Sequence, residues 1–160
     1  MIFPIYVYGH PVLRKVAQDI DRNFPDLDKF IEDMFETMYK SDGLGLAAPQ
    51  VGRSVRLFVI DGEPLAEDHP EMKDFRQAFI NPQVVERTGD RVPMNEGCLS
   101  IPGINEEVDR ESRIRIQYYD PQWNFHDEVY NGYKARVVLH EYDHLDGVLF
   151  TDRLSPLRRR

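Results

Sequence analysis

Two histidines one helical turn apart are the residues of this chain whose types and spacing point most directly to chemistry. They are His140 and His144, in the segment His-Glu-Tyr-Asp-His, and Glu141 follows the first of them. Residues at positions i and i+4 share one face of a helix, so both imidazoles can point at one ion. Glu141 lies roughly 100° further round the helix, where its carboxylate can reach a water molecule on that ion. The segment therefore predicts a metal site with a general base beside it.

A catalytic metal site of this kind needs a third protein ligand and an open position for water. One class of protease supplies a histidine six residues after the second histidine, following a glycine; this chain has Gly147 but Phe150 at the ligand position. Another class uses a glutamate well downstream, whereas the carboxylates after His144 are Asp146 and Asp152 alone. Neither protease pattern is complete.

The remaining candidates for the third ligand lie upstream of the histidine pair. His10, His69 and His126 occur in segments that read as irregular or solvated, which favours surface positions. Cys98 lies in Glu-Gly-Cys-Leu-Ser, followed by Ile-Pro-Gly, where glycine and proline allow a tight bend and close approach of the backbone. A thiolate with two imidazoles suits a borderline-soft divalent metal. We therefore predict that Cys98 is the third ligand.

Composition and charge limit the classes of protein to which the chain can belong. Its 160 residues, 41% hydrophobic and 30% charged, are typical of one globular domain with a sizeable core. The net charge of −8 argues against DNA binding, and the basic run 158–160 is interpreted as solvated rather than as a contact with ribosomal RNA. No window approaches the ~18 apolar residues that span a bilayer. A single cysteine and the absence of signal-peptide features predict a cytoplasmic protein without membrane contact.

Two helices are predicted, one before and one after a region rich in strands. The first, over residues 26–40, has apolar side chains recurring on one face at helical spacing. These side chains are Leu27, Phe30, Ile31, Met34, Phe35 and Met38. The second, over residues 133–145, carries the histidine pair and ends at Asp146-Gly147.

Strands are predicted between the helices, joined by turns too short for parallel crossovers. A glycine-rich loop over 43–50 precedes them, and 63–73 reads as an acidic surface excursion. The strands are 55–60, 78–87 with an interruption at Asn81-Pro82, and a hairpin of 114–119 and 125–130. The fold class is therefore α+β, with a mostly antiparallel sheet packed around a central metal-binding helix.

Three ordered segments carry a resemblance to a known family. Residues 43–50 (Gly-Leu-Gly-Leu-Ala-Ala-Pro-Gln), 96–100 (Glu-Gly-Cys-Leu-Ser) and 140–144 resemble the motifs of peptide deformylases, and Ser-Ile-Pro-Gly after the cysteine is similar to the bacterial form. The resemblance extends to residue 157. It implies a peptide-deformylase-like fold and a single catalytic domain over residues 1–160, with the C-terminal helix of many relatives absent or truncated.

The resemblance implies metal-dependent hydrolysis of the N-formyl group from the N-terminal formyl-methionine of nascent polypeptides, releasing formate. Glu141 would move the protons of the reaction. The Gln50 amide and the Leu99 backbone N–H would stabilise the oxyanion. The metal would be Fe(II) in the cell, with Zn or Ni in purified protein. Expected partners are N-formyl-methionyl nascent peptides and, as a weaker candidate, the ribosome.

The substrate is expected to lie in an apolar pocket beside the metal. The expected substrate-binding residues are Leu44, Gly45, Met94, Glu96, Tyr133 and Val137. Where some family members carry an arginine that steadies the peptide, this chain has Asn105, and Arg110, which matches a second family arginine, is predicted to pair with Asp143. Two other hypotheses remain: a general metallopeptidase, and a non-catalytic interaction module stabilised by a metal.

Overall fold

The chain forms one antiparallel sheet with a helix packed on each side of it. The computed structural model describes residues 1–154, so the basic run 158–160 lies outside the described residues. The main elements are α1 (Leu27–Lys40), β1 (Gly45–Ala47), β2 (Leu57–Asp61), β3 (Arg76–Cys98), β4 (Ile101–Tyr119), β5 (Phe125–Asn131) and α2 (Gly132–Leu145). The strands pair in chain order, all antiparallel, which confirms the predicted α+β class.

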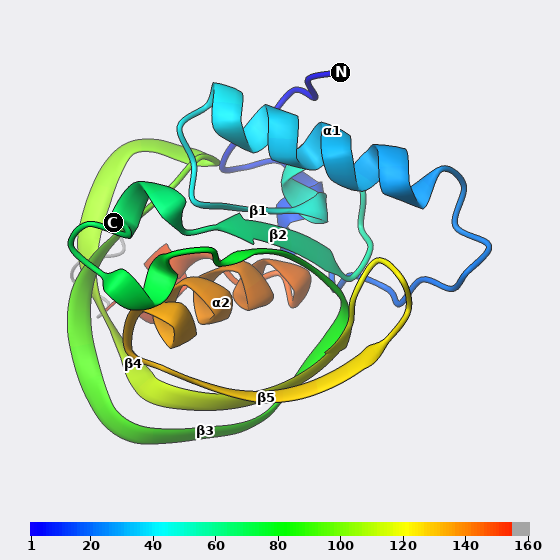
Figure 1. Cartoon of the computed structure of the whole chain (residues 1–160). Coiled ribbons are helices and arrows are strands. Elements are labelled where there is room, and N and C mark those ends of the chain that lie inside the picture. The colour runs from blue at the N-terminus through cyan, green and yellow to red at the C-terminus, as the bar shows by residue number, and fades with distance from the viewer. Residues whose placement is uncertain (155–160) are drawn as a thin grey trace.

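Strand β2 separates two hydrophobic cores. Its run from Leu57 to Ile60 is fully buried because successive side chains point to opposite faces of the sheet. Leu57 and Val59 pack with the apolar face of α1, whereas Phe58 and Ile60 pack with α2. Helix α1 therefore covers one face of the sheet, as Figure 1 shows, and α2 lies against the other.

Strands β3 and β4 form a long curved ribbon that wraps around α2 (Figure 1). The prediction of a short strand over 78–87 was wrong in length, because β3 continues to Cys98. The expected interruption is a bulge: Asn81 has a positive φ of 50°, and its side chain exchanges two hydrogen bonds with the Ile20 backbone. Both strands are largely exposed on one face, so their sequence lacks a continuous apolar signal.

The segments predicted as loops contain short ordered elements. The glycine-rich segment includes β1 and a 3₁₀ turn at Ala48–Val51. The acidic segment 63–73 includes two 3₁₀ turns, Glu63–Leu65 and Pro70–Met72, and Met72 is fully buried. A further 3₁₀ turn, Phe150–Arg153, follows α2 and packs against the ribbon. Among the described residues, no helix is long and apolar enough to cross a membrane.

Helix α2 lies in the middle of the molecule (Figure 1), and residues on nearly its whole circumference are buried. Several of these are polar or charged, including Arg136, Glu141, Asp143 and His144. Buried polar groups are costly unless they are hydrogen-bonded, paired or metal-bound. The partners of these side chains therefore define the site.

Candidate metal centre and substrate cavity

Cys98, His140 and His144 come together at the point where the end of β3 meets α2. One ligand atom from each of these residues lies within 4.8 Å of the other two. The Cys98 Sγ lies 3.4 Å from His144 Nε2, and the two imidazole centroids are 5.3 Å apart. Helical spacing brings the histidines together, but only the pairing of β3 with its neighbours brings Cys98 to them. Among residues 1–154, His10, His69 and His126 lie outside this group.

The charge states at this group fit a divalent cation. Burial opposes ionisation of the Cys98 thiol, but the imidazoles of His144 and His140 outweigh burial and lower its pKa to about 5. Glu96 accepts a hydrogen bond from the His140 imidazole (Nδ1 to Oε1, 2.8 Å), which leaves Nε2 of that ring for an ion. One thiolate and two imidazoles that converge within 4.8 Å are a donor set for Zn, Fe(II) or Ni.

Glu96 is the centre of a buried charge network. Arg110 donates to both of its oxygens, at 2.6 and 2.9 Å, and Arg136 donates to Oε2 at 2.6 Å. Burial raises the pKa of the Glu96 carboxyl, but the hydrogen bonds from His140 and Arg110 hold it well below its usual range. The carboxylate is therefore ionised and aimed at His140.

Asp143, on the same helix, extends the network. Its Oδ2 accepts from Arg110 at 2.7 Å, and Arg153 donates to both of its oxygens. Burial opposes ionisation of Asp143, but the two guanidinium groups lower its pKa. The predicted pair of Arg110 and Asp143 is confirmed.

Glu141 lies beside the metal group in a desolvated position. It is 5% exposed, and burial raises the pKa of its carboxyl, which the charges of His140 and His144 only partly oppose. Its Oε1 has no hydrogen-bond partner among the described residues. A buried carboxylate oxygen without a donor is available for a water molecule or a substrate N–H.

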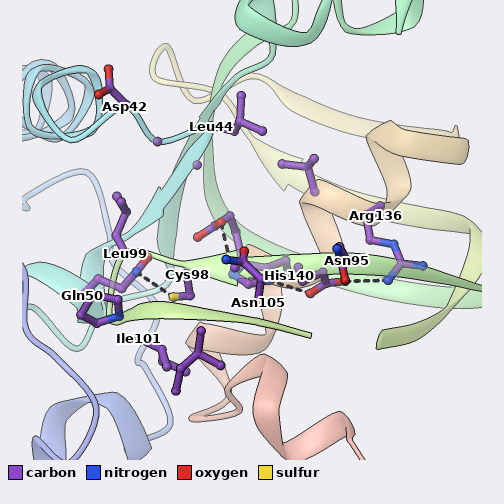
Figure 2. Close-up of a pocket in the computed structure, with 18 of the residues that line it drawn as sticks. Asp42, Leu44, Gln50, Asn95, Cys98, Leu99, Ile101, Asn105, Arg136 and His140 are labelled. Carbon is purple, nitrogen blue, oxygen red and sulfur yellow. Dashed lines mark hydrogen bonds and ion pairs between the residues drawn. The ribbon is translucent and has the colours of Figure 1, made fainter. Parts of the chain in front are cut away.

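Gln50 is oriented by its neighbours. Its Oε1 accepts from the Ala47 backbone N–H at 2.9 Å, and its Nε2 donates to Ser100 Oγ at 3.1 Å and to Cys98 Sγ at 3.4 Å. The amide nitrogen thus faces the metal group, as Figure 2 shows. Leu99 lies next to Cys98 in the same wall.

A cavity of about 430 Å³ opens beside these residues (Figure 2). Of the twelve predicted site residues, ten line it: Leu44, Gly45, Gln50, Glu96, Cys98, Leu99, Tyr133, Val137, His140 and Glu141. His144 lies behind them, 1% exposed.

Met94 is not among the residues that line this cavity, so its role in substrate binding stays a prediction. It lies two residues, roughly 7 Å along the strand, before Glu96. The structure instead places Asn95 and the α2 residue Arg136 at the cavity wall. Arg136 was missed, although it is four residues before His140 and shares a helix face with it.

Asn105, which stands where some relatives carry arginine, also lines the cavity. Its exposed side chain lies on β4, and its Oδ1 faces Gly97 of β3. A Cβ at Gly97 would come within 2.4 Å of that oxygen, so a larger residue there would displace the Asn105 side chain.

Comparison with known proteins agrees with this geometry. Residues 2–160 match the family model described as polypeptide deformylase. A peptide deformylase of Christiangramia forsetii is 50% identical, over 100% of this chain and 85% of the relative. A crystal structure of peptide deformylase from Thermotoga maritima superposes with a TM-score of 0.87 at 44% identity, covering 98% of this chain and 99% of the other. A Met-Ala-Ser-bound peptide deformylase from Acinetobacter baumannii superposes with a TM-score of 0.88 at 31% identity, covering 96% and 99%. The chain therefore belongs to the polypeptide deformylase family, the metal-dependent hydrolases that remove the formyl group from N-terminal methionine.

Proposed function

We propose that Cys98, His140 and His144 hold the catalytic ion, and that Glu141, Gln50 and Leu99 carry out the chemistry around it. The observation that carries this proposal is the convergence of three ligand atoms within 4.8 Å at the wall of a cavity. A divalent ion bound there would act as a Lewis acid and lower the pKa of a water molecule. Fe(II) is the ion we propose for the cell; Ni and Zn bind such donors more tightly and would replace it in purified protein.

Glu141 moves the protons in this proposal. It accepts a proton from the water that attacks the formyl carbon and returns it to the amine nitrogen as the C–N bond breaks. Formate and a free N-terminal amine are the products. The raised pKa of the Glu141 carboxyl makes it a better proton acceptor than an exposed glutamate would be.

Gln50 and Leu99 stabilise the negative charge that develops on the formyl oxygen. The Gln50 amide is held in one orientation by Ala47 and Ser100, so its N–H donors need no reorganisation during the reaction. Leu99, whose backbone N–H is the second proposed donor, follows Cys98 in the chain and lines the same cavity.

The methionine side chain is proposed to lie between Leu44, Tyr133 and Val137, which line the cavity. Strand β1 begins at Gly45 and is the edge strand of the sheet, so an extended peptide can pair with it as an added strand. The Met-Ala-Ser peptide named in the Acinetobacter baumannii structure has the length and chemistry of such an occupant.

Release of formate from a formyl-methionyl tripeptide by Fe(II)- or Ni(II)-loaded protein tests the proposal. The wild type is expected to release formate, and Glu141→Ala to retain the metal but lose most activity. Glu128→Ala is a control carboxylate that lies outside the cavity. No formate from the loaded wild type would refute the proposal, and peptide-bond cleavage would instead favour a metallopeptidase.

We also propose that residues 1–160 act as one catalytic domain, in the cytoplasm, on nascent chains at the ribosome. The proposed substrate supports this site of action, because formyl-methionine is the first residue of a newly made chain. Co-sedimentation with ribosomes, with and without residues 158–160, tests the contact. No binding by either form would refute the ribosome as a partner.

A further inference from the structure

Arg136 is a buried cation beside the metal group that the chemistry above does not use. It lies on α2, one turn before His140, and is 5% exposed although its side chain lines the cavity. Its guanidinium donates to three acceptors outside the helix: Glu96 Oε2 at 2.6 Å, the Val108 carbonyl at 2.7 Å, and the Val92 carbonyl. Arg136 therefore connects α2 to both strands of the curved ribbon.

The acceptors of Arg136 show what this connection positions. Val92 and Glu96 belong to β3, which ends at Cys98, and Val108 belongs to β4. The metal ligands come from the same two parts of the molecule, the end of β3 and α2. A bond network between α2 and β3 therefore sets the distance between the cysteine ligand and the histidine ligands.

Arg110 and Arg136 hold Glu96 in different ways. Arg110 lies on β4, in the same ribbon as Glu96, so its bidentate contact is internal to the ribbon. Arg136 lies on the helix that carries His140, and Glu96 accepts from both of these helix residues. Arg136 thus directly connects the ligand-bearing helix to the carboxylate that orients His140.

We propose that Arg136 is a positioning residue of this enzyme: chiefly through Glu96, with the Val92 and Val108 carbonyls as further acceptors, it fixes α2 against the ribbon, and so sets both the ligand geometry at His140 and the cavity wall. The inference rests on the proposed ligand set. A planar guanidinium can donate to three separated acceptors, whereas a lysine ammonium is a compact charge on a flexible stem and does not reproduce this fork. Removing the fork would also take a donor from the buried Val108 carbonyl and from the half-buried Val92 carbonyl.

The test uses Co(II)-loaded full-length protein and measures the visible spectrum of the ion and its rate of transfer to a chelator. Arg136→Met and Arg136→Lys are expected to alter the spectrum and to speed release by about tenfold or more, the usual effect of losing a group that orients a metal ligand. KM for a formyl-methionyl tripeptide should rise as well, since the side chain lines the cavity. Arg91→Met, an exposed arginine of the same ribbon, is the matched control and should leave all of these unchanged.

A double-mutant cycle separates positioning from simple stabilisation. If Arg136 acts through Glu96, Arg136→Met should have little further effect on the release rate in a Glu96→Gln background. A change of about twofold or less counts as no effect, because independent sites deviate from additivity by up to that amount. Circular dichroism at saturating metal confirms that each variant is folded.

Two outcomes would overturn the proposal. One is a folded Arg136→Met protein with the wild-type spectrum, release rate and KM, whatever its melting temperature. The other is the same tenfold faster release in both Glu96 backgrounds. Failure of the wild type to release formate would refute the proposed function alone, because the spectrum and release rate do not depend on turnover.

Discussion

At the scale of single residues, the site depends on side chains whose orientation is fixed by burial or by hydrogen bonds. Glu141 is buried with one oxygen unpaired among the described residues, and Gln50 is fixed by the Ala47 and Ser100 contacts. In the proposed reaction, each side chain would therefore meet the substrate in a set orientation. Small changes next to either residue should affect turnover more than stability.

Gly45→Ala should lower kcat strongly while the metal group stays intact. A Cβ at Gly45 would lie 2.7 Å from Glu141 Oε2 and 2.8 Å from its Cγ, so the carboxylate must move. A displacement of the carboxylate by about 1 Å can reduce turnover by roughly 10²-fold. Steady-state formate release and metal content measure the two effects. Gly43→Ala is the comparison, since its Cβ meets the flexible end of Leu99 and should cost less; equal losses in both variants would contradict this explanation.

Gln50→Glu should keep the fold and lose oxyanion stabilisation. The new carboxylate can still accept from Ala47, but it brings no N–H to the cavity and adds negative charge there. Loss of one such donor reduces kcat by about 10²–10³-fold. Stopped assays at saturating substrate measure kcat. Gln122→Glu, which changes an exposed glutamine in a turn, is the control. A kcat within twofold of wild type would exclude Gln50 from the oxyanion site.

At the scale of elements, β2 is shared by two cores that serve different purposes. The core with α1 contains none of the metal-binding residues, whereas the core with α2 supports the helix that carries the histidines. The two cores should therefore respond differently to truncation. A cavity in the α1 core should reduce stability without changing the metal group.

Met34→Ala tests this separation. Met34 is fully buried on α1, and its truncation should lower the free energy of unfolding by about 2–5 kcal/mol. Urea unfolding of the metal-loaded protein gives the loss, and kcat at 25 °C should be unchanged. The exposed Lys40→Ala variant of the same helix should stay within about 0.5 kcal/mol of wild type. A large fall in kcat for folded Met34→Ala would mean that the cores are coupled.

At the scale of the whole molecule, the ligands come from two parts that the chain separates by more than forty residues. Cys98 is the last residue of β3, and His140 and His144 lie on α2, around which the ribbon of β3 and β4 wraps. An ion bound to all three would tie these parts together and stabilise the folded state. The stability of the protein should therefore depend on metal concentration.

Metal removal should lower the melting temperature, and Cys98→Ala should abolish most of that dependence. An ion at about 100 times its Kd adds about 2.7 kcal/mol to the folded state. Thermal melts with chelator and with added Ni(II) measure the shift for wild type and variant. His126→Ala is the control, because its imidazole bonds to Asp120 away from the site. An equal metal-induced shift in Cys98→Ala would remove the thiolate from the ligand set.

Much of the candidate site was predictable because it consists of local patterns. The spacing of His140 and His144 places both on one helix face, and the apolar repeat of 26–40 specified α1 almost to the residue. The family resemblance of the three motifs is confirmed by matches over the full chain. The roles assigned to Gln50, Leu99 and Glu141 remain predictions.

What the sequence by itself determined is therefore the chemistry: the donor types, the carboxylate beside them and the family. Tertiary structure alone decided how they are arranged. The length of β3, the absence of Met94 from the cavity and the three acceptors of Arg136 all depend on pairing between residues far apart in the chain. Helical periodicity is written in neighbouring residues, whereas strand pairing and buried charge partners are set by which distant segments pack together.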